Sequence, residues 1–431
     1  MPSRSSQAPG SAHRERAALV GLMTGRAAAG DPSQSLDELA GLAESAGAHV
    51  VLRLLQERPR PDPATFLGKG KLDTLRRACE ETRAEVAIFD NELTPAQLRN
   101  LEKTLDRKVL DRTQLILDIF ARRARTREGK LQVELAQLRY LLPRLVGHGT
   151  ALSRLGAGIG TRGPGETKLE TDRRRIRHRI AGVARAIEDV RQRRAQLRER
   201  RHKAAVPTVT LVGYTNAGKT TLFNALTGEG AAASNALFVT LDPLVRRLRL
   251  PDTRQLLVSD TVGFIERLPH SLVAAFRATL EEVAGSDLLL HVIDAASVDR
   301  ERHGAAVRQV LADVGAESVP TIDVFNKCDR LEPDETARLR RAYPSAVFVS
   351  ALQGTAIPDL LDAMTAHLSL DTRRVIVEFA EGSEEDRRRI ARLYRYARVV
   401  RHLTVNGRVA IEADVPRRLL DRLDLGGVPT T

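Results

Sequence analysis

The sequence predicts an α/β protein in three parts: an α/β domain that continues into a helical hairpin, a domain built on a parallel sheet, and a small α+β domain. Three observations predict this arrangement. Apolar, strand-like runs alternate with helical patterns in residues 17–110 and again after Val206. A long, highly charged helical stretch separates these two regions. Near the C-terminus the dipeptide Asn406-Gly407, a strong turn signal, lies between two strand-like runs.

The predicted segments follow from changes in composition along the chain. We expect a disordered, Ser/Pro/Gly-rich N-terminus (residues 1–16), an α/β subdomain (17–110), a coiled-coil-like helical hairpin (111–204) with a glycine-rich loop (156–165), the sheet domain (205–369) and a small α+β C-terminal domain (370–431).

The elements of the first half are predicted from periodicity. Strand-like runs cover 17–22, 49–54 and 85–90, and helical patterns cover 36–46, 71–82, 94–105, 111–127, 129–145 and 166–203. Thr94 and Pro95 read as the N-cap and first turn of one of these helices.

In the second half, continuous apolar runs at 208–212, 255–259, 288–293, 321–325 and 346–349 are separated by helices, which predicts a parallel sheet covered on both faces. The C-terminal domain reads as a strand (375–379), a basic helix (384–400) and a hairpin (402–412).

The charge of the chain points to a polyanionic partner. The formal net charge is +13, and residues 166–203 contain 14 Lys/Arg against 6 Asp/Glu, a net of +8. A genome that prefers Arg codons explains why Arg outnumbers Lys. It does not explain why Lys and Arg together outnumber Asp and Glu. Nucleic acid is therefore favoured and an anionic membrane surface is secondary. The arginine-rich stretch 387–398 fits either an RNA contact or the solvent face of an amphipathic helix.

Other features exclude several classes. Two cysteines are too few for a disulfide framework, and we find neither a signal-peptide core nor an apolar run of membrane-spanning length, so we expect a cytoplasmic protein. His202, His270 and His291 lack partners at metal-ligand spacing and are interpreted as packed or solvent-facing.

A strand, then Gly213-Tyr-Thr-Asn-Ala-Gly218-Lys219-Thr220, then a helix meets the full context of a P-loop. Backbone N–H groups of such a loop surround phosphates. We expect Lys219 to bridge the β- and γ-phosphates and Thr220 to bind Mg²⁺. The expected phosphate-binding residues are Gly213, Tyr214, Thr215, Asn216, Ala217, Gly218, Lys219, Thr220 and Thr221. By contrast, Gly68-Lys-Gly-Lys71 resembles a phosphate-binding turn without that context, so a second nucleotide site is a weak alternative there.

The base is predicted from Asn326-Lys327-Cys328-Asp329, which follows a strand. The Asp329 carboxylate can accept two N–H groups of guanine at once, whereas adenine offers no such pair. Asn326 is expected to hold the loop and the base edge, and the Lys327 stem to lie along the ring. Ser350-Ala351, after the last strand, fits the remaining guanine-contacting loop.

The switch residues are predicted from order along the chain. Asp260, in Asp260-Thr-Val-Gly263, is the expected Mg²⁺-side carboxylate, and the Gly263 N–H is expected to contact the γ-phosphate. Thr240 is the expected switch threonine, closing over Mg²⁺; Thr227 and Thr253 compete less well for this role. The predicted catalytic residues are thus Lys219, Thr240 and Gly263, and the metal ligands Thr220 and Thr240.

Catalysis departs from the usual pattern at Phe264. Many GTPases carry a glutamine here to orient water, and a phenyl ring cannot do so. We therefore hypothesise slow basal hydrolysis that is accelerated by a partner. Asn216 raises K⁺ as a further candidate cation, as in some related GTPases; the alternative is that Asn216 only braces the loop.

Three stretches carry a resemblance to a family: Asp111-Arg-Thr-Gln-Leu-Ile-Leu-Asp-Ile-Phe120, Gly129-Lys-Leu-Gln-Val-Glu-Leu-Ala-Gln-Leu138 and Gly158-Ile-Gly-Thr-Arg-Gly-Pro-Gly-Glu166-Thr-Lys-Leu-Glu-Thr-Asp-Arg173. Together with Asp260-Thr-Val-Gly-Phe-Ile265 they resemble the HflX family of ribosome-associated GTPases, over residues 17–370. Leu155 and Ala157 stand where that family's pattern has glycines.

The resemblance implies a Mg²⁺-dependent GTPase that binds the large ribosomal subunit and splits or rescues idle and stalled ribosomes under stress. It implies that the loop between Leu142 and Gly165 is the tip that reaches toward the peptidyl-transferase centre, and that the basic helix runs along ribosomal RNA. No DNA specificity is expected, and a monomer is the default. The alternative function is an RNA- or membrane-surface adaptor whose nucleotide site senses GTP or GDP with little hydrolysis.

Overall fold

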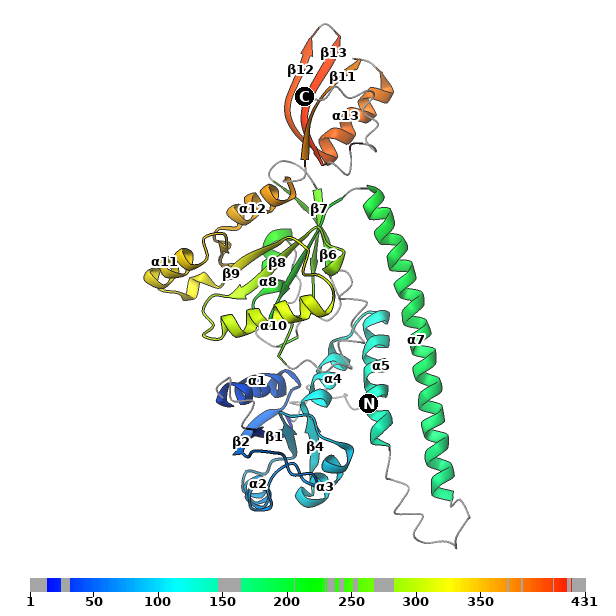
Figure 1. Cartoon of the computed structure of the whole chain (residues 1–431), viewed down its shortest axis with the longest axis vertical. Coiled ribbons are helices and arrows are strands. Elements are labelled where there is room, and N and C mark those ends of the chain that lie inside the picture. Colours follow the sequence, from blue (N-terminus) through cyan, green and yellow to red (C-terminus); the bar gives the residue numbers. More distant parts are fainter. Residues whose placement is uncertain are drawn as a thin grey trace, which may run out of the picture. The chain divides into compact units, whose positions relative to one another are not determined.

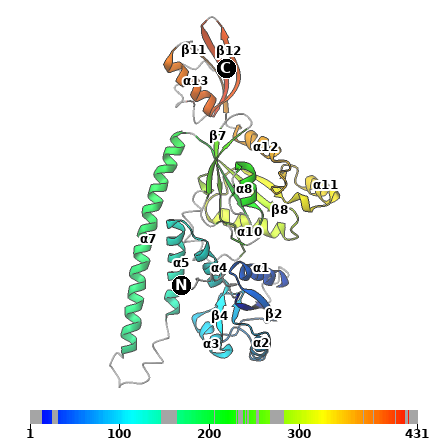
Figure 2. The same ribbon diagram turned by 180° about the vertical axis from the view of Figure 1, so that it is seen from behind.

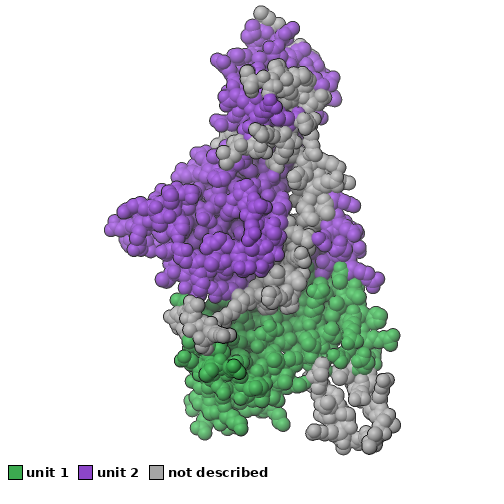
Figure 3. All heavy atoms as spheres, viewed as in Figure 1, with its two compact units in different colours: residues 1–124, 130–184 green, residues 125–129, 185–431 purple. Residues whose placement is uncertain are grey.

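The computed structural model describes residues 14–24, 32–145, 164–204, 206–228, 230, 237–238, 240, 244–250, 255–266, 283–369, 372–380, 383–405, 407–416 and 420 (Figure 1). Its contacts divide the chain into two compact units, residues 1–124 with 130–184 and residues 125–129 with 185–431 (Figure 3). Most of the predicted tip between Leu142 and Gly165, including most of the glycine-rich loop 156–165, lies outside the described residues, as do residues 1–13 of the N-terminus. No helix among the described residues is long and apolar enough to cross a membrane.

Unit 1 contains a four-stranded parallel sheet in the order β2-β1-β3-β4. The strands are β1 (Arg16–Met23), β2 (His49–Glu57), β3 (Val86–Phe89) and β4 (Lys108–Asp111), and the helices between them are α1 (Pro32–Ser45), α2 (Lys69–Glu81) and α3 (Pro95–Leu105). Apolar side chains of α2 and α3 form one core with the sheet, and α1 contacts β1 and β2. The α/β subdomain predicted from sequence is present, with β4 as an additional strand.

The start of α3 shows how the sequence sets local structure. Thr94 accepts a hydrogen bond from the Gln97 backbone, and the Gln97 side chain accepts one from the Thr94 backbone, while Pro95 occupies the first turn. This reciprocal capping satisfies N–H groups that have no partner inside the helix.

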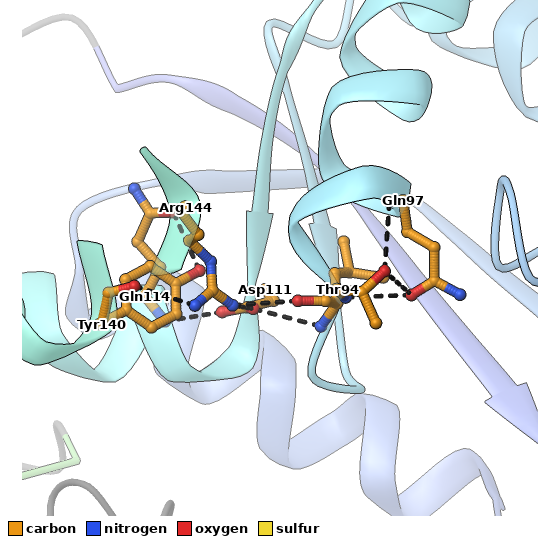
Figure 4. Close-up of polar contacts among 7 residues, drawn as sticks. Thr94, Gln97, Asp111, Gln114, Tyr140 and Arg144 are labelled. Atoms are coloured by element: carbon orange, nitrogen blue, oxygen red, sulfur yellow. Dashed lines mark hydrogen bonds and ion pairs between the residues drawn. The ribbon is translucent and has the colours of Figure 1, made fainter. Parts of the chain in front are cut away.

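Asp111 connects several elements of unit 1 (Figure 4). It is fully buried and caps α4 (Arg112–Arg123) by accepting from the Gln114 N–H at 2.9 Å. Its carboxylate also accepts from Leu93 N–H and from Arg144, the latter at 3.1 Å. Arg144 lies over the Tyr140 ring at the end of α5 (Arg127–Arg144), and burial raises the pKa of Tyr140. The last turn of α5 is thereby fixed to the sheet.

The predicted helix 111–127 is shorter than expected. It stops at Arg123, and the Thr126 hydroxyl then accepts a hydrogen bond from Gly129 N–H at the start of α5. The basic helix is present as α7 (Pro164–Ala204), and within unit 1 it lies antiparallel beside α5 (Figures 1 and 2). Arg179 of α7 pairs with Glu134 of α5.

The second unit is built on a six-stranded sheet in the order β10-β9-β8-β5-β7-β6. Its strands are β5 (Thr208–Gly213), β6 (Leu244–Arg249), β7 (Gln255–Asp260), β8 (Leu288–Asp294), β9 (Thr321–Asn326) and β10 (Val347–Phe348). Its helices are α8 (Lys219–Thr227), α10 (Arg300–Asp313), α11 (Pro333–Ala342) and α12 (Ile357–Ser369), with a 3-10 turn at Cys328–Arg330.

All pairs in this sheet are parallel except β6 with β7, so the predicted parallel sheet is confirmed, with one antiparallel strand added at its edge. Strand β6 was missed because its sequence, Leu-Val-Arg-Arg-Leu-Arg, has three arginines and only one buried residue. The carboxyl ends of the parallel strands meet at one edge of the sheet, where ligands bind in such folds.

The C-terminal domain has three antiparallel strands in the order β11-β13-β12. They are β11 (Thr372–Ala380), β12 (Arg398–Val405) and β13 (Arg408–Pro416), and α13 (Glu384–Tyr396) packs on one face of the sheet. The predicted hairpin around Asn406-Gly407 is confirmed by the pairing of β12 with β13. The predicted helix 384–400 was too long, because the chain from Arg398 pairs with β13 and its Val399 joins the sheet core.

Candidate active site

The loop between β5 and α8 is bounded by two glycines that the structure requires. Gly213 has φ +154° and Gly218 has φ +92°. A Cβ atom on Gly213 would collide with the carbonyl oxygen of Val292, and one on Gly218 with Nδ2 of Asn326. Close approach of neighbouring strands to the loop therefore excludes side chains at both positions.

Lys219 is the first residue of α8, and its ammonium group is buried inside the loop. It donates to the carbonyls of Gly213 at 3.1 Å and Tyr214 at 2.8 Å. Burial lowers the pKa of Lys219 to about 8, against the opposing effect of Asp260. A buried cation held at a helix N-terminus is suited to an anionic ligand.

Three side chains from separate segments converge beside this lysine. The Thr220 hydroxyl lies 2.7 Å from that of Thr240, and the two hydroxyls donate to Asp260 Oδ2 at 2.8 and 2.9 Å. Asp260 is fully buried, burial raises the pKa of its carboxyl group, and its Oδ1 has no hydrogen-bond partner among the described residues. A buried carboxylate with an open oxygen and two hydroxyls are hard oxygen donors of the kind that Mg²⁺ binds.

The competing threonines do not join this cluster. Thr227 bonds back to Phe223 within α8, and Thr253 lies outside the described residues. The structure thus brings together Thr220, Thr240 and Asp260, as expected from their order in the sequence. No group of three or more His, Cys, Asp or Glu residues suited to a metal occurs in the described part of the chain.

Asn326 connects the loop after β9 to the P-loop and to the loop after β10. Its Nδ2 donates to Ala217 O at 2.9 Å, and its Oδ1 accepts from Ala351 N–H at 2.9 Å. Ser350 donates to Asp329 Oδ1 at 2.5 Å. The four residues that sequence reasoning assigned to guanine from two distant motifs, Asn326, Asp329, Ser350 and Ala351, therefore form one bonded assembly.

Lys327 reveals a partner that sequence reasoning missed. Its Nζ donates to the Asn216 carbonyl and to Asp294 Oδ2, both at 2.7 Å. Asp294 is the last residue of β8, and only its position at the carboxyl end of an apolar strand could have pointed to it. Asn216 itself is exposed, with φ +60°, so its side chain is open to solvent.

Phe264 lies in the core with 2% of its surface exposed. Its N–H donates to Gly213 O at 3.0 Å, and its carbonyl accepts from Thr215 N–H at 2.7 Å. The Tyr214 hydroxyl accepts from Glu266 N–H, and its ring stacks on His303 of α10. The segment 263–266 is thus paired with the P-loop, and Gly263 lies so close to Lys219 and Thr215 that a Cβ there would come within 2.9 Å of both.

The histidines fit the interpretation as packed residues where they are described. His291 is buried, and its Nδ1 lies 2.8 Å from Asp323 Oδ1 on the neighbouring strand. His270 lies outside the described residues, and the side chain of His202 is also outside them.

The sheet, the glycine-bounded loop, the buried lysine and the hydrogen-bonded loops after β9 and β10 together define a P-loop GTPase. Family models match consecutive parts of the chain: "GTP-binding GTPase N-terminal" at residues 33–121, "GTP-binding GTPase Middle Region" at 123–201 and "50S ribosome-binding GTPase" at 208–327. The chain belongs to the HflX family of GTPases, which confirms the resemblance drawn from its sequence motifs.

Two relatives support this assignment. GTPase HflX of Caldanaerobacter subterraneus subsp. tengcongensis is 49% identical over 84% of this chain and 82% of its own length. GTPase HflX of Escherichia coli K12 is 50% identical over 78% of this chain and 79% of its own length. A solved structure, "crystal structure of SsGBP and GDP complex", aligns with a TM-score of 0.46 and 25% identity over 82% of this chain and 98% of that one.

Proposed function

We propose that this GTPase is Mg²⁺-dependent, binds the large ribosomal subunit in the cytoplasm, and splits or rescues idle and stalled ribosomes, with the ribosome accelerating hydrolysis. The observation that carries the proposal is the assembly around Lys219. The cation, the hydroxyls of Thr220 and Thr240, and the open oxygen of Asp260 lie together at one loop.

In this proposal the residues have separate roles. Amides of residues 213–221 and Lys219 bind the β- and γ-phosphates. Thr220 and Thr240 hold Mg²⁺, with Asp260 behind them, and the ion would neutralise charge that develops between the phosphates. The Gly263 N–H contacts the γ-phosphate, so its segment responds to hydrolysis. Asn326, Lys327 and Asp329, with Ser350 and Ala351, select guanine.

Slow basal turnover follows from Phe264. Because its side chain is in the core and its backbone is bonded to the P-loop, it cannot position water. The missing group must come from elsewhere in the chain or from the partner. K⁺ at Asn216 is a secondary candidate for added positive charge, and equal hydrolysis rates in Na⁺ and K⁺ buffers would remove it.

The ribosome is favoured as partner by two features. Helix α7 contains residues 166–203, which carry a net charge of +8, and such charge binds phosphate backbones without reading sequence. The model matched at residues 208–327 is described as a ribosome-binding GTPase. The alternative function, an RNA- or membrane-surface adaptor, is favoured only by Phe264.

The test is GTP hydrolysis by the purified chain with and without large ribosomal subunits. We expect strong stimulation, together with co-sedimentation that requires a GTP analogue. Fast turnover without ribosomes that large subunits leave unchanged would overturn the ribosome-coupled mechanism. Binding to any RNA or anionic vesicle regardless of nucleotide would favour the adaptor. Splitting itself is read from the loss of 70S particles on a sucrose gradient with GTP or its analogue.

A further inference from the structure

The C-terminal domain lies beyond the matched family models, which end at residue 327. Several of its arginines are neutralised by neighbouring carboxylates. Arg374 pairs with Asp414 at 2.9 Å and Glu412 at 3.4 Å, and Arg408 pairs with Glu378 at 3.3 Å. On the first turns of α13, Arg388 and Arg389 pair with the acidic residues that begin the helix.

A second set of arginines in this domain has no carboxylate partner among the described residues. Three of them are exposed on α13: Arg387, Arg392 and Arg395. Two more, Arg398 and Arg401, are exposed on β12, but the strand pairing sets them opposite Asp414 and Glu412, on the sheet face that points away from the core and α13. We call the three residues on α13 the arginine face. Carboxylates pair with the arginines named above and lie opposite Arg398 and Arg401, so the positive charge without a carboxylate partner is on α13.

An exposed aromatic pair borders the arginine face. Tyr394 is 41% exposed, although α13 has buried positions nearby, such as Leu393. Its hydroxyl lies 2.6 Å from Nδ1 of His402 on β12, and the two ring centroids are 5.9 Å apart. Arg387 lies seven residues before Tyr394, two turns along the same side of the helix. The hydrogen bond fixes two rings at the surface without burying them.

We propose that the arginine face, with Tyr394 and His402, is a binding surface for single-stranded RNA. The guanidinium groups would pair with backbone phosphates, and the Tyr394 ring would stack on a base. At α13 a membrane surface is disfavoured, because the apolar residues Ile390 and Leu393 pack into the domain core. The exposed apolar residues Val400, Leu403 and Val405 belong to β12 and not to the arginine face. An acidic protein would use the charge but would not need the exposed rings. The inference rests on the proposed function only for which RNA is bound in the cell.

The experiment uses the absence of tryptophan from the chain. Tyr394→Trp in the full chain places a single indole at the proposed stacking position. Ile376→Trp is the matched control, because Ile376 is 44% exposed but belongs to β11 positions that alternate with the buried core residues facing α13. Each variant is titrated at low salt with a single-stranded RNA of about 12 nucleotides, within the site sizes of single-strand binders, and separately with poly-glutamate. A fluorescent label on the RNA reports total binding by anisotropy.

We expect saturable quenching of the indole by RNA in Tyr394→Trp and none in Ile376→Trp. In the Tyr394→Trp background, Arg387, Arg392 and Arg395→Gln should lower the slope of log affinity against log salt by about 2, at about 0.7 per lost phosphate contact. The same charge change at the paired Arg374, Arg388 and Arg408 should leave the slope nearly unchanged.

Two results would overturn the proposal. One is RNA binding, seen by anisotropy, that leaves the indole emission of the Tyr394→Trp variant unchanged, since other basic segments such as α7 would then carry all the binding. The other is equal quenching by poly-glutamate, which would make the surface one for acidic proteins. Ribosome-stimulated hydrolysis by the unsubstituted chain is measured in parallel, so failure of this surface is distinguishable from failure of the proposed function.

Discussion

Asn326→Ala tests whether one buried amide holds the nucleotide site together. The side chain is 2% exposed and makes two hydrogen bonds at 2.9 Å, one to Ala217 of the P-loop and one to Ala351 of the guanine loop. Truncation leaves the Ala217 carbonyl and the Ala351 N–H group without a hydrogen-bond partner, and each such buried group costs about 1–3 kcal/mol. In the free protein, water can enter and the loops can move apart, so that cost is relieved. Binding must reassemble the loops, so the loss appears in affinity.

At the lower end of this range, the two groups together cost about 2 kcal/mol, so the affinity for GDP should fall at least about 30-fold. The assay is titration with a fluorescent guanine nucleotide, with circular dichroism to show that the chain is folded. Asn100→Ala is the matched control, because Asn100 makes one exposed hydrogen bond, to Ala64 in unit 1. That variant should bind GDP within two-fold of the unsubstituted chain. An Asn326→Ala protein that is folded and binds GDP within three-fold would refute the reasoning.

Three further predictions follow from the site. Because burial lowers the pKa of Lys219 to about 8 and a bound phosphate raises it, GDP affinity should be full below pH 8 and fall above it, with proton uptake on binding at about pH 8.5 in calorimetry; no uptake would contradict this. Asp260→Asn should lower hydrolysis by at least about 100-fold without lowering the melting temperature of the nucleotide-free protein, since burial already disfavours the charge; unchanged Mg²⁺ dependence would count against the site. Phe264→Gln should destabilise the chain by about 2–4 kcal/mol and not speed basal turnover, measured as phosphate release; a clear increase would show that water access, not the core, limits the rate.

The candidate site could be placed from the sequence because its residues are tied to the ends of strands. Gly213 and Lys219 are joined by a short loop between β5 and α8, so the chain itself keeps them close together. Asp260 and Asn326 end β7 and β9, and parallel strands bring their carboxyl ends to one edge. Thr240 is different, because it lies in no helix or strand. Its role as the switch threonine was predicted only from order along the chain, and the structure sets its hydroxyl 2.9 Å from Asp260 Oδ2.

The elements that were missed or misjudged depend on tertiary contacts. Strand β4 has only four residues and is defined by pairing with β3. Strand β6 is an edge strand with a charged sequence, so periodicity does not reveal it. The end of α13 was misplaced because an Arg-rich helix and an Arg-rich edge strand share a composition. Asp294 was missed because a single Asp at a strand end is common, and only the fold brings Lys327 to it.

Phe264 shows how the motif and the structure constrain one another. From sequence, it is the wrong side chain for holding water. In the structure, the phenyl ring packs in the core and the backbone on both sides of it is bonded to the P-loop at Gly213 and Thr215. A glutamine here would have to leave the core, and those two backbone bonds would have to break before it could reach a phosphate. The same packing that keeps this segment against Lys219 therefore prevents position 264 from supplying a catalytic group, so the group that orients water must come from a different segment or from another molecule.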